Sequence, residues 1–150
     1  SNKVKDIAPF THTIHSIDSL KLLQEVNKQA LKNSRIIRVL LEIHVAQEET
    51  KFGIREDEVY ALIDAIKDMP HVHVMGLMTI APFVENPEEN REIFRTLKKL
   101  SVDIAAKNIN NVTMSVLSMG MTGDYQVAVQ EGATMVRVGT GIFGERNYAV

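Results

Sequence analysis

The sequence contains no cysteine, no long hydrophobic run and no marked excess of charge of either sign. Without cysteine, the chain can form neither a disulfide framework nor a cysteine-ligated zinc site, and cysteine nucleophilic catalysis is excluded. Its apolar runs fall far short of the roughly 20 residues that a membrane-spanning helix requires. The first residues lead into no apolar segment with a small-residue cleavage site, so we expect a cytoplasmic setting.

The charged side chains are nearly balanced, with 17 basic and 19 acidic residues and a formal net charge of -2. This balance provides no basic field that would neutralise nucleic-acid phosphates, so binding to DNA or RNA is not expected. Of the 150 residues, 45% are apolar. A chain of this size and composition can bury one sizeable core, and no linker or low-complexity tract interrupts it. We therefore expect a single domain over residues 1–150.

Short, β-branched apolar runs alternate with longer stretches of helical spacing, which is typical of an α/β fold. The apolar runs predict strands at residues 13–17, 36–45, 72–80, 112–118 and 134–138. Helices are predicted at residues 18–33, 55–69, 86–104 and 124–131. Most of the predicted strands are apolar at nearly successive positions, which favours a parallel sheet that is covered on both faces.

Five strands and four helices are compatible with an open, doubly wound sheet or with part of a (β/α)8 barrel of the TIM type. A full barrel needs about 250 residues, so the barrel interpretation makes this chain a C-terminal portion of one, with the first strands lying upstream.

Glycine and small polar residues are densest at the ends of the last two predicted strands. They form the segments SMGMTGD (residues 118–124) and RVGTGIFG (residues 137–144). Glycine lets a backbone approach an anion closely, and backbone N–H groups and hydroxyls donate hydrogen bonds to it. We therefore consider a phosphate pocket, as barrels often have after their last strands, against the alternative that these glycines only form turns. Neither segment matches a Walker P-loop or the G-x-G-x-x-G fingerprint.

Arg137 lies between two valines in a predicted strand, and a buried arginine needs a partner. Its guanidinium points either into the mouth of a barrel, toward a ligand, or toward a carboxylate such as Glu42. His71 and His73 share one face of a strand without a carboxylate that would complete a metal site, so we expect them to have a hydrogen-bonded, structural role. Lys51, in a polar loop, is either solvated or directed at an anionic ligand.

Taken together, the two glycine-rich segments resemble those of the YggS-like pyridoxal phosphate homeostasis proteins, relatives of the N-terminal barrel of alanine racemase. Residues 1–5, 15–18, 51–53 and 76–78 agree with the same family. The resemblance implies a (β/α)8 barrel that holds pyridoxal 5'-phosphate at its mouth. It also implies a carrier or regulator of the cofactor pool, with apo-enzymes as possible recipients, and no established catalytic reaction.

The resemblance also implies roles for individual residues. Ser118, Gly139 and Thr140 would bind the phosphate, and Arg137 would face the pyridine nitrogen. A charged guanidinium there keeps the ring nitrogen unprotonated, which weakens the ring as an electron sink. The cofactor-binding residues expected from the two segments are Ser118, Met121, Thr122, Arg137, Gly139 and Thr140.

The sequence departs from the family pattern in three places. The lysine that holds the cofactor covalently in this family lies upstream of the segment that matches residues 2–3, so no lysine of this chain receives that role. His44 stands where relatives commonly have asparagine, and Thr122 where serine is more usual. A sheet with five of eight barrel strands would have two open edges, so we expect self-association through them.

Two other functions are compatible with the sequence. One is a racemase-like enzyme on the same barrel, which would require a proton-transferring base that no motif in the chain provides. The other is a small α/β domain that binds a phosphorylated metabolite.

Overall fold

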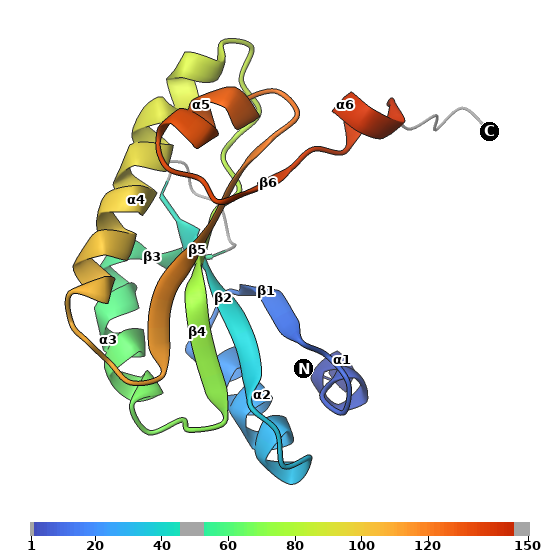
Figure 1. Cartoon of the computed structure of the whole chain (residues 1–150), viewed down its shortest axis with the longest axis vertical. Helices are drawn as coiled ribbons and strands as arrows, with labels where there is room; N and C mark the ends of the chain where they lie inside the picture. The colour runs from blue at the N-terminus through green and yellow to red at the C-terminus, as the bar shows by residue number, and fades with distance from the viewer. Residues whose placement is uncertain (1, 46–52, 146–150) are drawn as a thin grey trace.

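The computed structural model describes residues 2–45 and 53–145. Helices and strands alternate through most of this part of the chain (Figure 1). The elements are, in order, α1 (Asn2–Ile7), β1 (Thr13–Ile17), α2 (Leu20–Lys32), β2 (Ile37–His44), β3 (Ile54–Arg55), α3 (Glu56–Ile66), β4 (Val72–Met78), the 3-10 helix η1 (Pro87–Asn90), α4 (Arg91–Ala105), β5 (Val112–Met121), α5 (Tyr125–Gln130), β6 (Met135–Arg137) and α6 (Thr140–Phe143).

The sheet is parallel, and its strands lie side by side in the order β1-β2-β4-β5-β6, with the short β3 paired to the end of β2. This spatial order follows the chain order without a reversal. A doubly wound sheet reverses its strand order at a switch point, so that expectation is wrong and the barrel interpretation is confirmed. Helices α2 to α5 accordingly cover one face of a curved sheet, as in an arc of a barrel (Figure 1).

The hydrophobic core lies between this helical layer and the outer face of the sheet. Each helix contributes side chains at helical spacing, and Val39 and Leu41 of β2 meet them from the sheet. Phe94 on α4 is the largest fully buried side chain. In α3 and α4, apolar side chains at helical spacing are buried, as the periodicity predicts; they are Val59, Leu62, Ile63, Ile66, Phe94, Leu97, Leu100 and Ile104. In α2, Leu20 and Leu31 are 38% and 57% exposed, because they lie at the margin of the buried face of that helix.

The observed element bounds correct several expectations. Strand β5 continues to Met121, three residues beyond the predicted end at residue 118, so residues 119–121 belong to a strand and not to a loop. The helix predicted from residue 86 begins as the 3-10 turn η1, where the Asn86 side chain accepts a hydrogen bond from the N–H of Glu88 at 3.1 Å. Elements α1, β3 and α6 were not predicted, because segments of two to six residues carry too little periodicity to be recognised.

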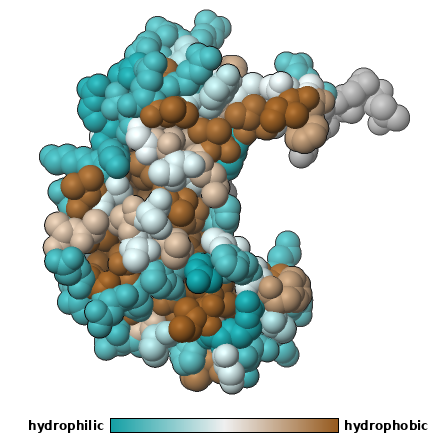
Figure 2. Space-filling model, in the orientation of Figure 1, coloured by the Kyte–Doolittle hydropathy of each residue, from teal (hydrophilic) through white to brown (hydrophobic). Residues whose placement is uncertain are grey.

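The opposite face of the sheet is concave and, within residues 2–45 and 53–145, no helix covers it. Figure 2 shows the resulting hollow on the side of the molecule away from α3 and α4. Arg38, Thr113 and Ser115 are exposed on the strands. Strands β1 and β6 form the two edges of the sheet. Of the helices that the structure describes, none is long and apolar enough to cross a membrane.

Candidate functional site

A cavity of about 700 Å³ opens at the carboxyl ends of the strands. Three segments that are distant in the sequence form its walls: the loop after β4, the turn between β5 and α5, and the segment that enters α6. The lining residues are Ile80, Ala81, Pro82, Phe83, Val84, Met121, Thr122, Gly123, Asp124, Gly139, Thr140, Phe143 and Gly144. This volume lies within the range of small-molecule sites, roughly 300–1,000 Å³.

Four of the six residues expected at the site line this cavity, namely Met121, Thr122, Gly139 and Thr140. The other two lie next to it without lining it. Arg137 is paired in register with Met121 across β5 and β6, and Ser118 is fully buried three residues before Met121 on β5. The structure therefore brings the two glycine-rich segments together at one end of the sheet.

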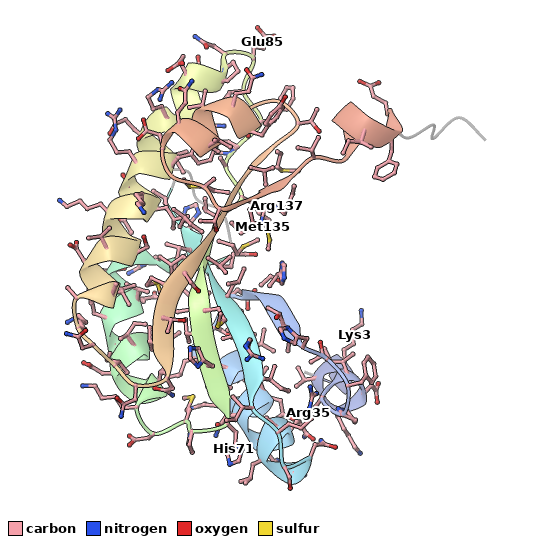
Figure 3. The ribbon with its side chains drawn as sticks, viewed as in Figure 1. Lys3, Arg35, His71, Glu85, Met135 and Arg137 are labelled. Atoms are coloured by element: carbon pink, nitrogen blue, oxygen red, sulfur yellow. The ribbon has the colours of Figure 1, made fainter. Side chains whose placement is uncertain are left out.

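Arg137 is hydrogen-bonded to β5 and to the residue that follows β4. One guanidinium nitrogen donates to the Ser118 hydroxyl at 3.2 Å, and the other donates to the carbonyl oxygen of Thr79 at 2.6 Å. These bonds use two of the five N–H donors of the guanidinium. Figure 3 labels Arg137 and Met135 on β6, at the opposite end of the sheet from Arg35 and His71.

The alternative of a direct salt bridge from Arg137 to Glu42 is wrong, since no ion pair joins them among the described residues and the observed partners are Ser118 and Thr79. The charge of Glu42 nevertheless affects the pKa of Arg137 without a direct contact. Burial lowers the pKa of Arg137, while Glu42 and Asp124 oppose that shift. Burial raises the pKa of Glu42, the charge of Asp18 adds to the effect, and Arg137 works against it.

The structure explains why glycine is required at one position of the site but not at another. Gly120 has a φ of +100° within β5, and a Cβ there would lie 2.6 Å from that of Ala128, so both the backbone conformation and the packing require glycine. Gly139 has an ordinary φ of -100° and no atom within 4 Å of the position of a Cβ. Backbone conformation and packing therefore explain Gly120 but not Gly139, whose backbone faces the open space of the cavity.

Thr122 joins two walls of the cavity, because its hydroxyl accepts a hydrogen bond from the N–H of Gly141 at 3.1 Å. A Cβ on Gly141 would lie 2.8 Å from a methyl carbon of Thr122, so the two segments approach closely. The hydroxyls of Thr122 and Thr140 and the backbone at Gly139 thus line one cavity. Such a group of donors suits an anionic ligand atom.

The other side chains singled out in the sequence lie elsewhere. The His71 ring is hydrogen-bonded to the carbonyl oxygen of Arg35 at 2.9 Å, and His73 to the Thr113 hydroxyl at 3.1 Å, which confirms their hydrogen-bonded role. His44 ends β2 and pairs in register with Arg55. Lys51 lies outside the described residues. No group of three metal-ligating side chains occurs in the part of the chain that the structure describes.

Sequence reasoning missed two parts of the site. The first is the loop after β4, which forms one wall through residues 80–84, and the second is Asp124 with its partner Asn90. The loop could have been found from its position, since the ends of parallel strands meet at one end of a barrel. Nothing in the sequence pattern links Asn90 to Asp124.

A singly wound parallel sheet with helices on its outer face and a cavity at the carboxyl ends of its strands defines the arc of a (β/α)8 barrel with a mouth site. The family model described as alanine racemase, N-terminal domain, matches residues 2–147. The chain belongs to this family.

Individual relatives agree with that assignment. The pyridoxal phosphate homeostasis protein of Aquifex aeolicus is 44% identical over 148 residues, covering 99% of this chain and 64% of its own length. The structure of PipY from Synechococcus elongatus with pyridoxal phosphate bound is 28% identical, has a TM-score of 0.85, and is matched over 95% of this chain and 66% of its own. The crystal structure of a protein from Bifidobacterium adolescentis is 35% identical, has a TM-score of 0.88, and is matched over 95% of this chain and 56% of its own. The chain spans less than two thirds of the length of these curated and solved relatives.

Proposed function

We propose that this chain binds pyridoxal 5'-phosphate and acts as a non-catalytic carrier or regulator of the cofactor pool. The observation that carries the proposal is the convergence of residues 121–124 and 139–144 on one cavity, in a chain of this family. Relatives at up to 44% identity are named pyridoxal phosphate homeostasis proteins. The sequence resemblance assigned the same two segments to the cofactor.

The residues present fit the phosphate group of this cofactor. Thr122 and Thr140 provide hydroxyls, and the backbone beside Gly139 is open to a close approach. In our proposal these groups hold the phosphate. Ser118 is fully buried in β5 and does not line the cavity, so in our proposal its hydroxyl acts on the phosphate end through Arg137, from which it accepts a hydrogen bond. The charge of Arg137 adds a favourable field at the same end of the sheet.

The aromatic ring of the cofactor requires an apolar surface in the cavity. Ile80, Phe83 and Met121 line the cavity with apolar surface, which suits a flat aromatic group. In our proposal Arg137 directs its remaining N–H donors at the ring nitrogen. When bound, pyridoxal phosphate supplies an electron-accepting ring. A guanidinium that donates to the ring nitrogen keeps this atom unprotonated, and so favours storage of the cofactor over catalysis.

The surroundings of Asp124 support a non-catalytic role. Asp124 is the acidic side chain among the lining residues. Its two carboxylate oxygens accept hydrogen bonds from the N–H of Met121 and from the Asn90 amide, both at 2.8 Å. The turn after β5 and the Asn90 side chain thus hold both oxygens of Asp124, which gives this carboxylate a structural role. No specific observation favours the racemase-like alternative.

The proposal extends to the setting of the protein. Residues 1–150 form one domain that corresponds to a C-terminal portion of a cofactor-binding barrel. It operates in the cytoplasm and passes its cofactor to apo-enzymes. The edges of the sheet at β1 and β6 pair with a second copy, because unpaired strand edges favour association. Sedimentation at rising protein concentration tests the last point, and a monomer at every concentration would exclude it.

Calorimetric titration of the chain with pyridoxal 5'-phosphate and with pyridoxal tests the proposed function. We expect the phosphorylated compound to bind about tenfold more tightly or better, since charge-assisted hydrogen bonds to the phosphate are lost with pyridoxal. Thr122→Val and Thr140→Val should reduce that preference. Equal affinity for the two compounds, or no binding of either, would overturn the proposal.

A second arm asks whether binding is covalent. No lysine is among the residues that line the cavity in the described part of the chain. We therefore expect borohydride treatment of the complex to leave no stoichiometric adduct on any lysine of this chain, as read by intact mass and peptide mapping. A stoichiometric adduct on one lysine, for example Lys51, would contradict phosphate-directed binding without a covalent bond.

A further inference from the structure

Asn90 is a buried polar residue that does not itself line the cavity. It lies where η1 meets α4 and is 1% exposed. Its amide nitrogen donates to the carbonyl oxygen of Pro82 at 3.0 Å and to the Asp124 carboxylate at 2.8 Å. Because both partners are acceptors, the nitrogen and not the oxygen of the amide must face them. The amide oxygen is buried and makes no hydrogen bond within the described residues.

The two partners of Asn90 belong to different walls of the cavity. Pro82 lies in the loop after β4, and Asp124 closes the turn after β5. The Asn90 amide group thus donates one hydrogen bond to each of these two walls. Asn90 itself does not line the cavity, so its contribution to binding must pass through the residues that it holds.

Asp124 carries the link onward to the hydroxyl at the site. Its other carboxylate oxygen accepts from the N–H of Met121 at 2.8 Å, and its own N–H donates to the carbonyl oxygen of Met121 at 3.2 Å. These two bonds close a turn that contains Thr122. Thr122 in turn accepts from the N–H of Gly141. A continuous series of hydrogen bonds therefore connects Asn90 to the segment that enters α6.

We propose that Asn90 is a positioning residue for the phosphate end of the cavity, acting through Asp124 to hold Thr122 and the 121–124 turn against the loop after β4. This inference rests on the proposed function for its ligand but not for its geometry. A negative charge beside a phosphate site opposes binding by itself. The positioning role explains why a carboxylate is nevertheless present, since Asp124 binds N–H donors on both oxygens.

The test uses Asn90→Asp, which keeps the size of the side chain and replaces the donor to Asp124 by a second carboxylate. We expect amide hydrogen exchange at Met121 and Gly141 to become faster, with exchange at Leu41 in the core unchanged. Affinity for pyridoxal 5'-phosphate should fall about tenfold, the loss expected for one charge-assisted hydrogen bond, while affinity for pyridoxal stays the same.

The reversed pair, Asn90→Asp with Asp124→Asn, supplies the rescue. An asparagine at position 124 can donate to an aspartate at position 90 and still accept from Met121, although the aspartate cannot donate to the carbonyl oxygen of Pro82. Exchange protection at Met121 and Gly141 and the affinity should therefore recover in part relative to the single variant. Asn86→Ala is the matched control, because it removes a cap from the same helix start without touching the cavity. It should lower the melting temperature and leave the preference for the phosphate unchanged.

The outcomes separate the inference from the proposed function. Unchanged exchange in Asn90→Asp, or a reversed pair no better than the single variant, would overturn the positioning role. Wild-type chain that fails to prefer pyridoxal 5'-phosphate over pyridoxal would overturn the proposed function, while the exchange measurements would still decide the role of Asn90.

Discussion

Arg137→Lys is the substitution that best tests how this site is built. The guanidinium bridges two acceptors in different segments, the Ser118 hydroxyl in β5 and the carbonyl oxygen of Thr79, which follows β4. A lysine keeps the charge, but its single ammonium group cannot reproduce the planar fork that reaches both acceptors. Thr79 is 2% exposed, so water cannot fully replace the lost donor at that residue.

The expected cost follows from that loss. Removing one hydrogen bond between a charged donor and a buried acceptor costs about 1.5–3 kcal/mol, and because Arg137 is only half-buried we expect the lower end, about 1.5 kcal/mol. For a chain of this size such a loss lowers the melting temperature by about 3–6 °C. Chemical and thermal unfolding of wild-type and variant chains measure both quantities.

The control is Arg38→Lys. Arg38 is also an arginine on a strand, but it is exposed, and its guanidinium contacts only the ring of His12 among the described residues, at 3.2 Å. We expect a change within about 0.5 kcal/mol there. If Arg137→Lys were as stable as Arg38→Lys, the bonds to Ser118 and Thr79 would not contribute as argued, and Arg137 would be held by something else.

Two further predictions concern the sheet and its mouth. A Cβ on Gly76 would lie 1.7 Å from the carbonyl oxygen of Val116, so Gly76→Ala should force β4 and β5 apart. We expect urea unfolding to show a loss of stability of about 3 kcal/mol, and a loss below about 1 kcal/mol would refute this prediction. Burial, followed by the charge of Asp18, raises the pKa of Glu42, so the stability associated with this carboxyl is present at acidic pH and is lost as pH rises through its raised pKa. Glu42→Gln should therefore gain stability relative to wild type as pH rises from about 4 to about 8, and a constant difference would contradict this.

Much of the secondary structure could be predicted from the sequence because long elements carry a clear period. The helix stripe that includes Phe94 and Leu97 is buried as its spacing predicts, and the first predicted strand coincides with β1. Short elements could not be predicted, since the four residues of α6 complete only one turn. The extension of β5 to Met121 was also missed, because glycine and polar residues at its end suggested a loop.

The candidate site could also be predicted only in part from the sequence. The residue types in segments 118–124 and 137–144 indicated an anion pocket, because glycine backbone and hydroxyls have that chemistry wherever they meet. The partners of Arg137 could not be predicted, as Glu42 was an equally reasonable acceptor. Only the register of β4, β5 and β6 places Thr79 and Ser118 within reach of its guanidinium.

The sequence by itself determined the class of the fold, the alternation of strands and helices, and the chemical character of the two glycine-rich segments, because each depends on residues close together along the chain. The tertiary structure alone decided the register of the strands, the third wall of the cavity after β4, and the link from Asn90 to Asp124. These depend on contacts between residues up to 58 positions apart, as for Arg137 and Thr79. No local pattern encodes such contacts, since they arise only when parallel strands bring their carboxyl ends to one place.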